Sequence, residues 1–414
     1  MKPAKKPTGF TVPGRVRPFG KATKHTPVWL KAILGRELSP TREEYDRVTQ
    51  ALWHGDGAMD ALVAWMFEAD TRTRKAQIQR AIEHGNKGLE DAPEAIQVFF
   101  RTLEKPPEWI DFELIEEGAC FIHGLGAAAG YVLRDLALMG GYMLSGFNQS
   151  LVKTGALNKG TAQRIAETAK WWVDCTEQGG LQPFAPGYQT TLQVRLVHAL
   201  VRRGLDKRSD WDHSQWGLPL SQIDMVATYL GFSVVMLVGL RKLGIPVLPR
   251  ESKAVLHLWS YACWLMGVEE QWLVQSERHG FVLLNHTYMT QSQPDETSQE
   301  LARALAEEPL ERSYARWQSL QRKLSYHQHL GMSRYFLGKH NLERLGFEDP
   351  EFPWYPLLSN APRAIAYTTG HFFPGQRERQ QRRGRKAQRD MMAAMFGDRK
   401  HGIIDPNDRH PAHV

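Results

Sequence analysis

One histidine of this sequence lies among residues that could hold a cofactor. It is His198 in the segment LQVRLVHALVR, and on a helix its neighbours one turn to either side are Val194, Arg195, Val201 and Arg202. An imidazole on such an apolar wall can bind iron from one side, as in a haem site, and arginines can pair in bidentate fashion with propionate carboxylates. The alternative is an ordinary core histidine, with both arginines at a solvated edge.

A second segment carries polar side chains at helical spacing. The sequence TAQRIAETAKWW predicts a helix that places Arg164 and Thr168 on one face, with Glu167 beside Arg164. These three side chains could line a cavity above a cofactor. The alternative is a surface ion pair between Arg164 and Glu167, with Ile165 and Trp172 facing the core.

Other motifs for cofactor or metal chemistry are absent or out of context. The glycine-rich run 124–130 resembles a phosphate loop, but Glu116 and Glu117 precede it on a helical pattern and no βαβ unit follows. Close packing of helices is therefore the favoured interpretation of its glycines. None of the sixteen histidines has glutamate three residues before it, which argues against a di-iron bundle. His327 and His329 point to different helix faces, so we interpret them as solvated surface.

The elements that position these residues are predicted to be helices. Alternation with period two is almost absent, and no hairpin dipeptide separates apolar runs, so the fold class is all-α. A helix start is predicted at Ser39-Pro40-Thr41, and the capping pattern from Ser221 to Asp224 begins a long apolar helix over 222–242.

Composition divides the chain into three parts. Residues 1–38 are predicted to be a basic extended arm, and residues 39–347 the helical domain. Residues 348–414 are expected to combine an irregular proline- and aromatic-rich segment with a basic tail, in which 377–389 form a short solvated helix.

The net charge of +7 comes from the two ends of the chain. Residues 1–36 contribute +9 and residues 371–414 contribute +5, so the part between them carries −7. A nucleic-acid partner would depend on those ends alone, and we expect none. The three cysteines form no CxxC pair, which excludes a disulfide scaffold and a four-cysteine zinc site.

No targeting or membrane-spanning segment is predicted. The N-terminus has no apolar core of a signal peptide. The longest apolar stretches, 118–133, 136–152 and 225–240, are shorter than the about 20 residues that span a bilayer, so we interpret them as core helices. We expect a cytoplasmic protein, with peripheral membrane contact through its basic ends as a minor alternative.

Several motifs occur in an order that resembles the latex-clearing proteins (rubber oxygenases). They are RxxxTxxxW from residue 164, VRxxHAxxR from residue 194 and GxPxSQxDMxxTxxxFS from residue 217. The same family includes mpaB-type oxygenases, among them the fungal membrane-bound enzyme that trims the farnesyl chain in mycophenolic acid biosynthesis. The resemblance runs from about residue 110 to 275 and is looser on either side.

The resemblance implies a globin-like helical core around b-type haem. It makes His198 the proximal iron ligand and places Arg164 and Thr168 on the distal side. It leaves Arg195 and Arg202 as propionate contacts or structural residues. Characterised members use haem iron and dioxygen to cleave isoprenoid double bonds, beside an apolar substrate channel.

Two departures from the family pattern limit what can be transferred. Glu167 stands where the rubber-cleaving members carry lysine, and the region 141–150 offers Asn148 and Gln149 in place of a distal glutamate. Rubber is therefore not the expected substrate, and Glu167 becomes a candidate distal base. We expect a haem b oxygenase acting with dioxygen on a small apolar, isoprenoid or lipid-like substrate. The alternative is a non-enzymatic haem protein that senses a diatomic ligand or carries haem. The sequence leaves the oligomeric state open.

Overall fold

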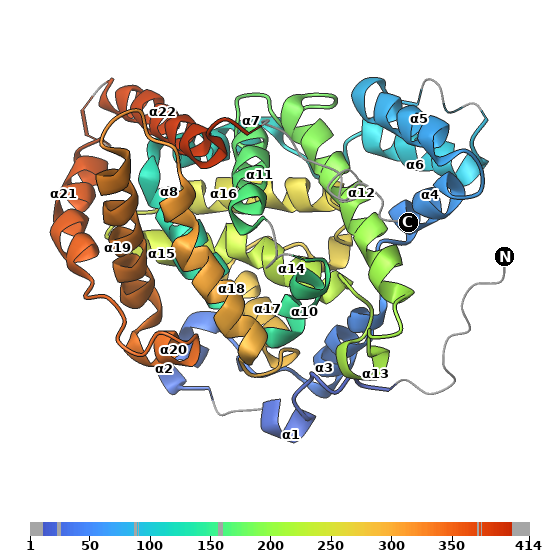
Figure 1. Ribbon diagram of the computed structural model, residues 1–414, viewed down its shortest axis with the longest axis horizontal. Helices are drawn as coiled ribbons and strands as arrows, with labels where there is room; N and C mark the ends of the chain where they lie inside the picture. Colours follow the sequence, from blue (N-terminus) through green and yellow to red (C-terminus); the bar gives the residue numbers. More distant parts are fainter. Residues whose placement is uncertain are drawn as a thin grey trace.

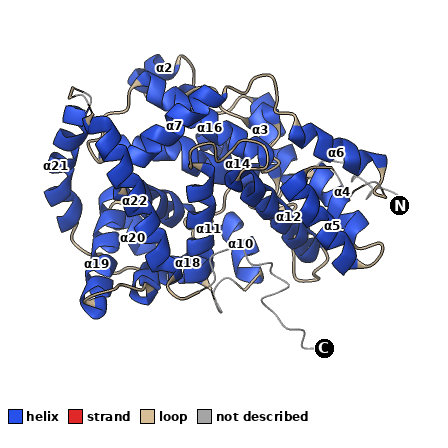
Figure 2. Cartoon of the chain, turned by 90° about the horizontal axis from the view of Figure 1, so that it is seen from above, coloured by secondary structure: helices blue, strands red, loops and turns tan. Residues whose placement is uncertain are grey.

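The fold is known from a computed structural model of the whole chain. The residues it describes are 11–22, 26–86, 89, 91–155, 160–370, 372–373 and 375–399. These residues form helices joined by loops and turns, and they contain no strand (Figure 2). The prediction of an all-α fold is confirmed.

The N-terminal helices form one end of the molecule and part of its lower edge in Figure 1. They are α1 (Phe19–Ala22), α2 (Val28–Leu34), α3 (Arg42–Gln50), η1 (Ala51–Trp53), α4 (Gly57–Met66), α5 (Thr71–His84) and α6 (Glu94–Glu104). Thr41 caps α3 and exchanges hydrogen bonds with Glu44, so the helix begins after the predicted Ser39-Pro40 rather than at it.

The central helices build the core. They are α7 (Phe112–Gly124), α8 (Ala127–Tyr131), η2 (Val132–Leu138), α9 (Met139–Gly141), α10 (Ser145–Lys153), α11 (Thr161–Cys175), α12 (Pro186–Asp206), α13 (His213–Trp216), α14 (Gln222–Leu230), η3 (Gly231–Val235), α15 (Met236–Lys242), α16 (Pro249–Leu265), η4 (Glu270–Trp272) and α17 (Glu277–Met289). Helix α7 lies against α16 at Gly118, where a Cβ would stand 2.7 Å from the Ala254 carbonyl oxygen. Within the run 124–130, a Cβ on Gly130 would stand 2.8 Å from Met391 of the C-terminal helix Gln376–Phe396, so the run also serves close helix packing, as the sequence indicated.

The capping prediction at Ser221 is confirmed. The Ser221 side chain accepts from the Asp224 backbone, and α14, η3 and α15 continue as one apolar helix over Gln222–Lys242. By length and composition this is the one helix of the described residues that could cross a membrane, but 67% of its apolar 18-residue window is buried inside the protein. Such burial is what a core helix requires, and residues 231–235 within it adopt the wider π-helical turn.

The C-terminal helices cover the opposite end of the molecule (Figure 1). They are α18 (Glu296–Glu307), η5 (Glu308–Glu311), α19 (Gln318–Leu337), α20 (Lys339–Arg344), α21 (Trp354–Gly370) and α22 (Gln376–Phe396). The prediction of an irregular segment after residue 348 is wrong, because α21 occupies most of it. Its apolar residues lie on an exposed face as well as on the buried one, which hides the helical period.

The predicted solvated helix over 377–389 is also wrong in length and environment. Helix α22 runs on to Phe396 and packs on α7 and α11. Arg385 and Gln388 are buried, where Arg385 donates to the Thr176 hydroxyl at 3.1 Å and Gln388 to the Ile122 carbonyl at 2.8 Å. The tail over 400–414 lies outside the described residues.

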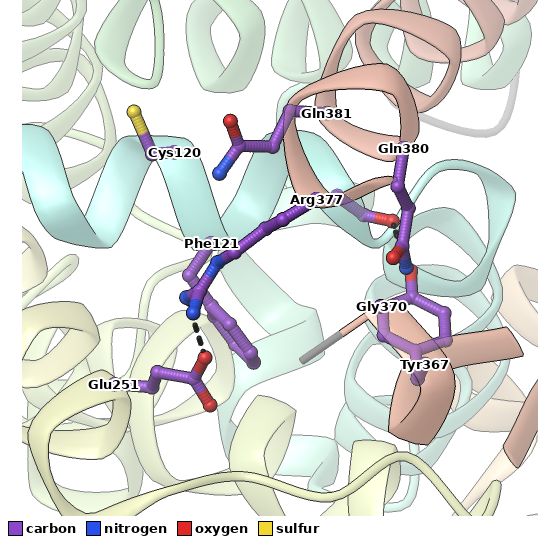
Figure 3. Close-up of a pocket in the computed structure, with 9 residues that line it drawn as sticks. Cys120, Phe121, Glu251, Tyr367, Gly370, Arg377, Gln380 and Gln381 are labelled. Atoms are coloured by element: carbon purple, nitrogen blue, oxygen red, sulfur yellow. Dashed lines mark hydrogen bonds and ion pairs between the residues drawn. The ribbon is translucent and has the colours of Figure 1, made fainter. Parts of the chain in front are cut away.

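A small cavity marks where α22 meets the body of the protein. Figure 3 shows Arg377 of α22 reaching across it to Glu251 of α16, with an N–O distance of 2.7 Å. The cavity measures about 20 Å³, the room of a single water molecule. It can hold neither a cofactor nor an apolar substrate, so we treat it as part of the anchor of α22.

The extended arm predicted for residues 1–38 is wrong where the structure describes it. Residues 19–22 and 28–34 form α1 and α2. Arg15 is buried, where its guanidinium pairs with the Asp224 carboxylate and its Nε donates to the Thr290 carbonyl at 3.0 Å. Because that charge is neutralised in the interior, it is not available to a polyanion. Lys2, Lys5, Lys6 and Lys24 lie outside the described residues.

Candidate cofactor site

Helices α11 and α12 frame the predicted site. They meet at the loop that joins them, where Trp171 Nε1 donates to the Thr191 hydroxyl at 2.9 Å and Cys175 Sγ lies 3.3 Å from the same oxygen. Gly187 permits this contact, because a Cβ there would stand 2.6 Å from the Asp174 carbonyl oxygen. From this end the two helices spread apart toward Thr161 and Asp206 (Figure 1). The predicted site residues lie along the diverging halves.

The antiparallel register brings the predicted residues to matching levels. Trp171 lies level with Thr191, so one turn further on Thr168 comes level with Val194, and two turns on Arg164 comes level with His198. Arg164 and Thr168 share the face of α11 that Trp171 turns to α12. The sequence prediction that these two residues lie on one helix face is confirmed by the helical bounds of α11.

The face of α12 that carries the histidine is apolar and incompletely covered. Val194, Val197, His198 and Val201 are half-exposed along this line, while Ala199 beside them is fully buried. A half-exposed valine stripe in the middle of a 21-residue helix leaves apolar surface open to an apolar ligand. The stripe has one polar group, the imidazole.

His198 lacks the partners of an ordinary core histidine. Its Nδ1 is buried and has no hydrogen-bond partner within the described part of the chain. Burial lowers the pKa of His198 to about 4, and the nearby charge of Arg202 acts in the same direction. The imidazole is therefore neutral at pH 7, with a nitrogen lone pair free to bind a metal.

Three aromatic side chains from α11, η3 and α16 form a cluster beside the start of α12. Trp171 lies 5.2 Å from Phe232 and 5.5 Å from Trp259, and Phe232 lies 5.0 Å from Trp259, measured between ring centroids. Phe232 belongs to the π-helical turn η3. One turn before it, Thr228 of α14 is exposed although most of that helix is buried. The Thr228 hydroxyl donates to the Asp224 carbonyl of its own helix at 3.1 Å.

Both predicted arginines of α12 are engaged by carboxylates near the start of α4. Arg195 Nε and Nη2 donate to Asp56 at 2.6 and 2.9 Å, and its Nη1 donates to the Leu265 carbonyl at 3.0 Å. Arg202 Nε lies 3.1 Å from both oxygens of Asp60. The two arginines hold α4 against α12, as in the structural alternative left open by the sequence. Their contact with a cofactor stays a prediction.

The distal candidates differ in exposure. Thr168 is exposed and its hydroxyl donates to the Arg164 carbonyl at 2.9 Å. Glu167 is buried and accepts from Gln163 Nε2 at 3.0 Å. Burial raises the pKa of the Tyr142 phenol, and the charge of Arg164 nearby opposes that rise.

Asn148, in the region of the missing distal carboxylate, is buried and held through its side-chain nitrogen. Its side-chain nitrogen donates to the Tyr142 carbonyl at 2.8 Å and to the Ser298 hydroxyl at 3.1 Å. The amide is therefore held by α18 and the turn before α10. Glu167 remains the acid of the predicted set.

Two known proteins are similar to this chain in sequence or fold. Rubber oxygenase of Streptomyces sp. (strain K30) is 25% identical over 186 residues, which cover 44% of this chain and 45% of that protein. The alignment thus spans less than half the length of this relative. A solved structure of a latex clearing protein in the closed state superposes with a TM-score of 0.60 at 18% identity, covering 86% of this chain and 94% of that one, which shows the shared fold.

A family model gives the assignment. It describes the catalytic domain of ER-bound oxygenase mpaB/B' and rubber oxygenase, and it matches residues 123–367. That range includes α11, α12 and the aromatic cluster, and it makes up more than half of the sequence. This chain belongs to the ER-bound oxygenase mpaB/B' and rubber oxygenase family.

Proposed function

We propose that this chain is a b-haem-dependent oxygenase that acts with dioxygen on an apolar, isoprenoid or lipid-like substrate. Family membership supports the reaction class. The observation that carries the haem assignment is His198, a neutral imidazole whose buried Nδ1 has no partner among the described residues. A bound haem would supply the redox chemistry with dioxygen that no amino-acid side chain provides.

The residues on α12 fit such a group. His198 offers one uncharged nitrogen ligand, and Val194, Val197 and Val201 offer half-exposed methyl groups along the same line. A flat apolar macrocycle needs this combination of one ligand and an apolar wall. We assign His198 as the proximal ligand.

On the opposite helix, Arg164, Glu167 and Thr168 would act on the distal side. The Thr168 hydroxyl can donate to a reacting oxygen in place of the Arg164 carbonyl that it now contacts at 2.9 Å. Arg164 would place a fixed positive charge where negative charge develops, and Glu167 would accept a proton. The aromatic cluster of Trp171, Phe232 and Trp259 would exclude water from one side.

The substrate is proposed to be smaller than rubber. Glu167 stands where the rubber-cleaving relatives carry lysine, and Asn148 is held by Tyr142 and Ser298. A changed charge beside the reacting atoms alters which substrate and proton-transfer steps are favoured. We therefore propose a short isoprenoid or lipid chain.

The absorption spectrum of purified protein tests the haem assignment. Wild type from haem-replete cells is expected to be coloured, with a pyridine haemochrome spectrum of b-type haem. His198→Ala is expected to lose the haem, and added imidazole to restore it in part. His213→Ala is the matched control, because His213 is exposed and pairs with Asp206 at 2.9 Å. A colourless wild type, or a spectrum unchanged in His198→Ala, would exclude the assignment.

Oxygen consumption separates the enzyme from the alternative haem protein. Haem-loaded protein mixed with a panel of farnesyl and longer isoprenoid lipids is expected to consume dioxygen and to form carbonyl or hydroxyl products. Binding of carbon monoxide without consumption of dioxygen by any lipid would favour the non-enzymatic sensor or carrier.

A further inference from the structure

The C-terminal helices form an exposed apolar surface at one end of the molecule. Half of the large apolar side chains that are exposed in the described residues belong to residues 317–373. Helices α19 and α21 lie side by side there, and both stand at the outer edge in the two views (Figures 1 and 2). The opposite end of the molecule has no comparable concentration among its described residues.

One face of α21 contributes a continuous apolar stripe. Leu357, Leu358 and Ile365 are 57%, 71% and 64% exposed, and Ala361 and Pro362 between them are exposed as well. These positions cover one side of the helix and include no charged residue. The stripe is therefore long and uncharged.

The other face of α21 is held by the protein. The Tyr367 hydroxyl donates to the Gly124 carbonyl of α7, and Ala364 packs near Gly244, where a Cβ would stand 3.2 Å from the Ala364 Cβ. Because α21 is fixed on this side, its exposed stripe has a defined direction. Apolar side chains presented in this way are costly in water and indicate a binding surface.

Positive charge lies directly after the stripe. Arg379, Arg382 and Arg383 of α22 are exposed, and none of them has a carboxylate partner in the described residues. Arg377 and Arg389, on the same helix, pair with Glu251 and Glu177 at 2.7 and 2.6 Å. Three arginines of α22 thus remain available to anions.

The stripe and the arginines are joined at a short turn. Gln376, the first residue of α22, donates to the Thr369 hydroxyl near the end of α21 at 3.3 Å. Within this turn Phe372 and Phe373 are 76% and 60% exposed. Two adjacent phenylalanines therefore project where the apolar and cationic surfaces meet.

We propose that α21, the Phe372–Phe373 turn and the first turns of α22 dock onto an anionic lipid surface. The leucines, the isoleucine and the phenylalanines enter the boundary between headgroups and acyl chains, and the arginines lie among the lipid phosphates. Long arginine side chains can follow the apolar surface and still keep their charge at the headgroup level.

Charge favours a lipid surface over a second copy of this chain. A two-fold dimer across this face would gather the three unpaired arginines of each copy into one interface, where their charges add unfavourably. An anionic membrane supplies both the negative charge and the apolar layer. The surface does not depend on haem or on the reaction, so its test is independent of the proposed function.

Co-sedimentation of the full-length protein with vesicles tests the proposal. We expect binding to vesicles of phosphatidylcholine with phosphatidylserine, and weak binding to phosphatidylcholine alone. The double variant Leu357→Gln/Leu358→Gln should weaken binding to the anionic vesicles by about 10- to 100-fold, because two large apolar side chains no longer enter the bilayer. Arg379→Gln/Arg382→Gln/Arg383→Gln should weaken it by about a hundredfold.

Matched variants at the opposite end of the molecule are the controls. Val98→Gln on α6 removes a half-exposed apolar side chain, and Arg72→Gln/Lys75→Gln/Arg80→Gln on α5 removes three positive charges. Both should bind vesicles as wild type does. Circular dichroism should show the same thermal midpoint for all variants, because every substituted side chain is at the surface.

Several outcomes would overturn the proposal. The proposal is wrong if the wild-type protein stays in the supernatant in the presence of anionic vesicles. Binding that the control variants weaken as much as the α21 and α22 variants would also overturn it. Competition by inorganic phosphate beyond that of sodium chloride at equal ionic strength would point to a site for free phosphate. Self-association that only the leucine variant abolishes, without vesicle binding, would assign the stripe to a second copy.

Discussion

Two histidines with a buried Nδ1 atom occupy opposite kinds of surroundings. His329 of α19 has both ring nitrogens in contact with charged groups: Nδ1 lies 2.7 Å from Asp135 Oδ2 and Nε2 lies 3.1 Å from Arg312 Nη1. His198 of α12 has a buried Nδ1 with no partner among the described residues. Burial lowers the pKa of both imidazoles, so each is neutral at pH 7.

The surroundings of His329 form a closed network of charges. Arg134 Nη1 lies 2.6 Å from Asp135 and its Nε 3.2 Å from Glu308, and Arg312 donates twice to Glu308 at 2.8 Å. All these side chains are buried. The arginines and acids pair with one another inside the network, and burial raises the pKa of Asp135 to about 7.

The contrast separates a structural histidine from the proposed ligand. In the network around His329, each charged side chain has a hydrogen-bond partner within the network. These contacts connect the π-helical turn η2 to η5 and α19. His198 lies within a half-exposed valine stripe, and its neighbours Arg195 and Arg202 pair with Asp56 and Asp60. An interior imidazole costs stability unless something pairs with it, and that cost is consistent with selection for a bound group.

Breaking the network should have the largest effect on stability. Glu308→Ala leaves Arg134 and Arg312 buried without their shared acid, and removal of one partner of a buried ion pair costs about 3–5 kcal/mol. Urea unfolding should show this loss, whereas Glu311→Ala, an exposed acid three residues on, should not. An unfolding free energy equal to wild type in Glu308→Ala would mean that the network contributes specificity rather than stability.

Replacing His329 and His198 by leucine should affect stability to different extents. His329→Leu removes two partners from buried charged groups and should cost about 1–3 kcal/mol. His198→Leu removes an imidazole with an unpartnered nitrogen and should change stability by less than about 0.5 kcal/mol, or raise it. Both are measured by urea unfolding of haem-free protein, because a bound ligand would stabilise the folded state. Equal losses in the two variants would contradict the contrast.

Local sequence patterns predicted the helices better than their partners. The capping pattern at Ser221 and the spacing of Arg164 and Thr168 are local, and both predictions hold. His327 is exposed, as expected, but His329 two residues on is buried in the charge network, so its interpretation as solvated surface is wrong. Its partners Asp135 and Arg312 lie in other helices, which residue spacing cannot bring together.

The wrong predictions at the two ends of the chain have the same cause, which is that residue spacing does not show contacts between distant helices. Arg15 looked solvated because its acid, Asp224, is more than 200 residues away in the sequence. Helix α21 looked irregular because two faces are apolar, one buried and one exposed. The aspartates that engage Arg195 and Arg202 gave no local signal, since they belong to α4.

A third interior histidine extends the comparison to pH. Burial lowers the pKa of His286 to about 4, and its Nε2 has no partner in the described structure. Between pH 6.5 and 4 the unfolded chain binds this proton and the folded chain does not, so stability falls as pH falls through that window. The slope contributed by one such group reaches about 1.4 kcal/mol per pH unit. Thermal midpoints of wild type should therefore fall from pH 7 to pH 4.5.

The variant His286→Leu should show a shallower fall over that pH range, even if its midpoint at pH 7 is lower. His327→Leu, at the exposed surface, is the control and should keep the slope of wild type. Parallel curves for wild type and His286→Leu would show that this histidine titrates alike in the folded and unfolded chain.

The smallest effect on stability is expected at Thr168. Its side chain is exposed, and its hydroxyl donates to the Arg164 carbonyl of the same helix. Thr168→Val should therefore change the unfolding free energy by less than about 0.5 kcal/mol. If its hydroxyl positions a reacting oxygen as proposed, turnover should fall by about tenfold or more, with the haem spectrum retained. Thr228→Val tests the exposed hydroxyl of α14 in the same way. Full turnover in both variants would assign the two threonines to the helix surface and leave Arg164 and Glu167 as the distal groups.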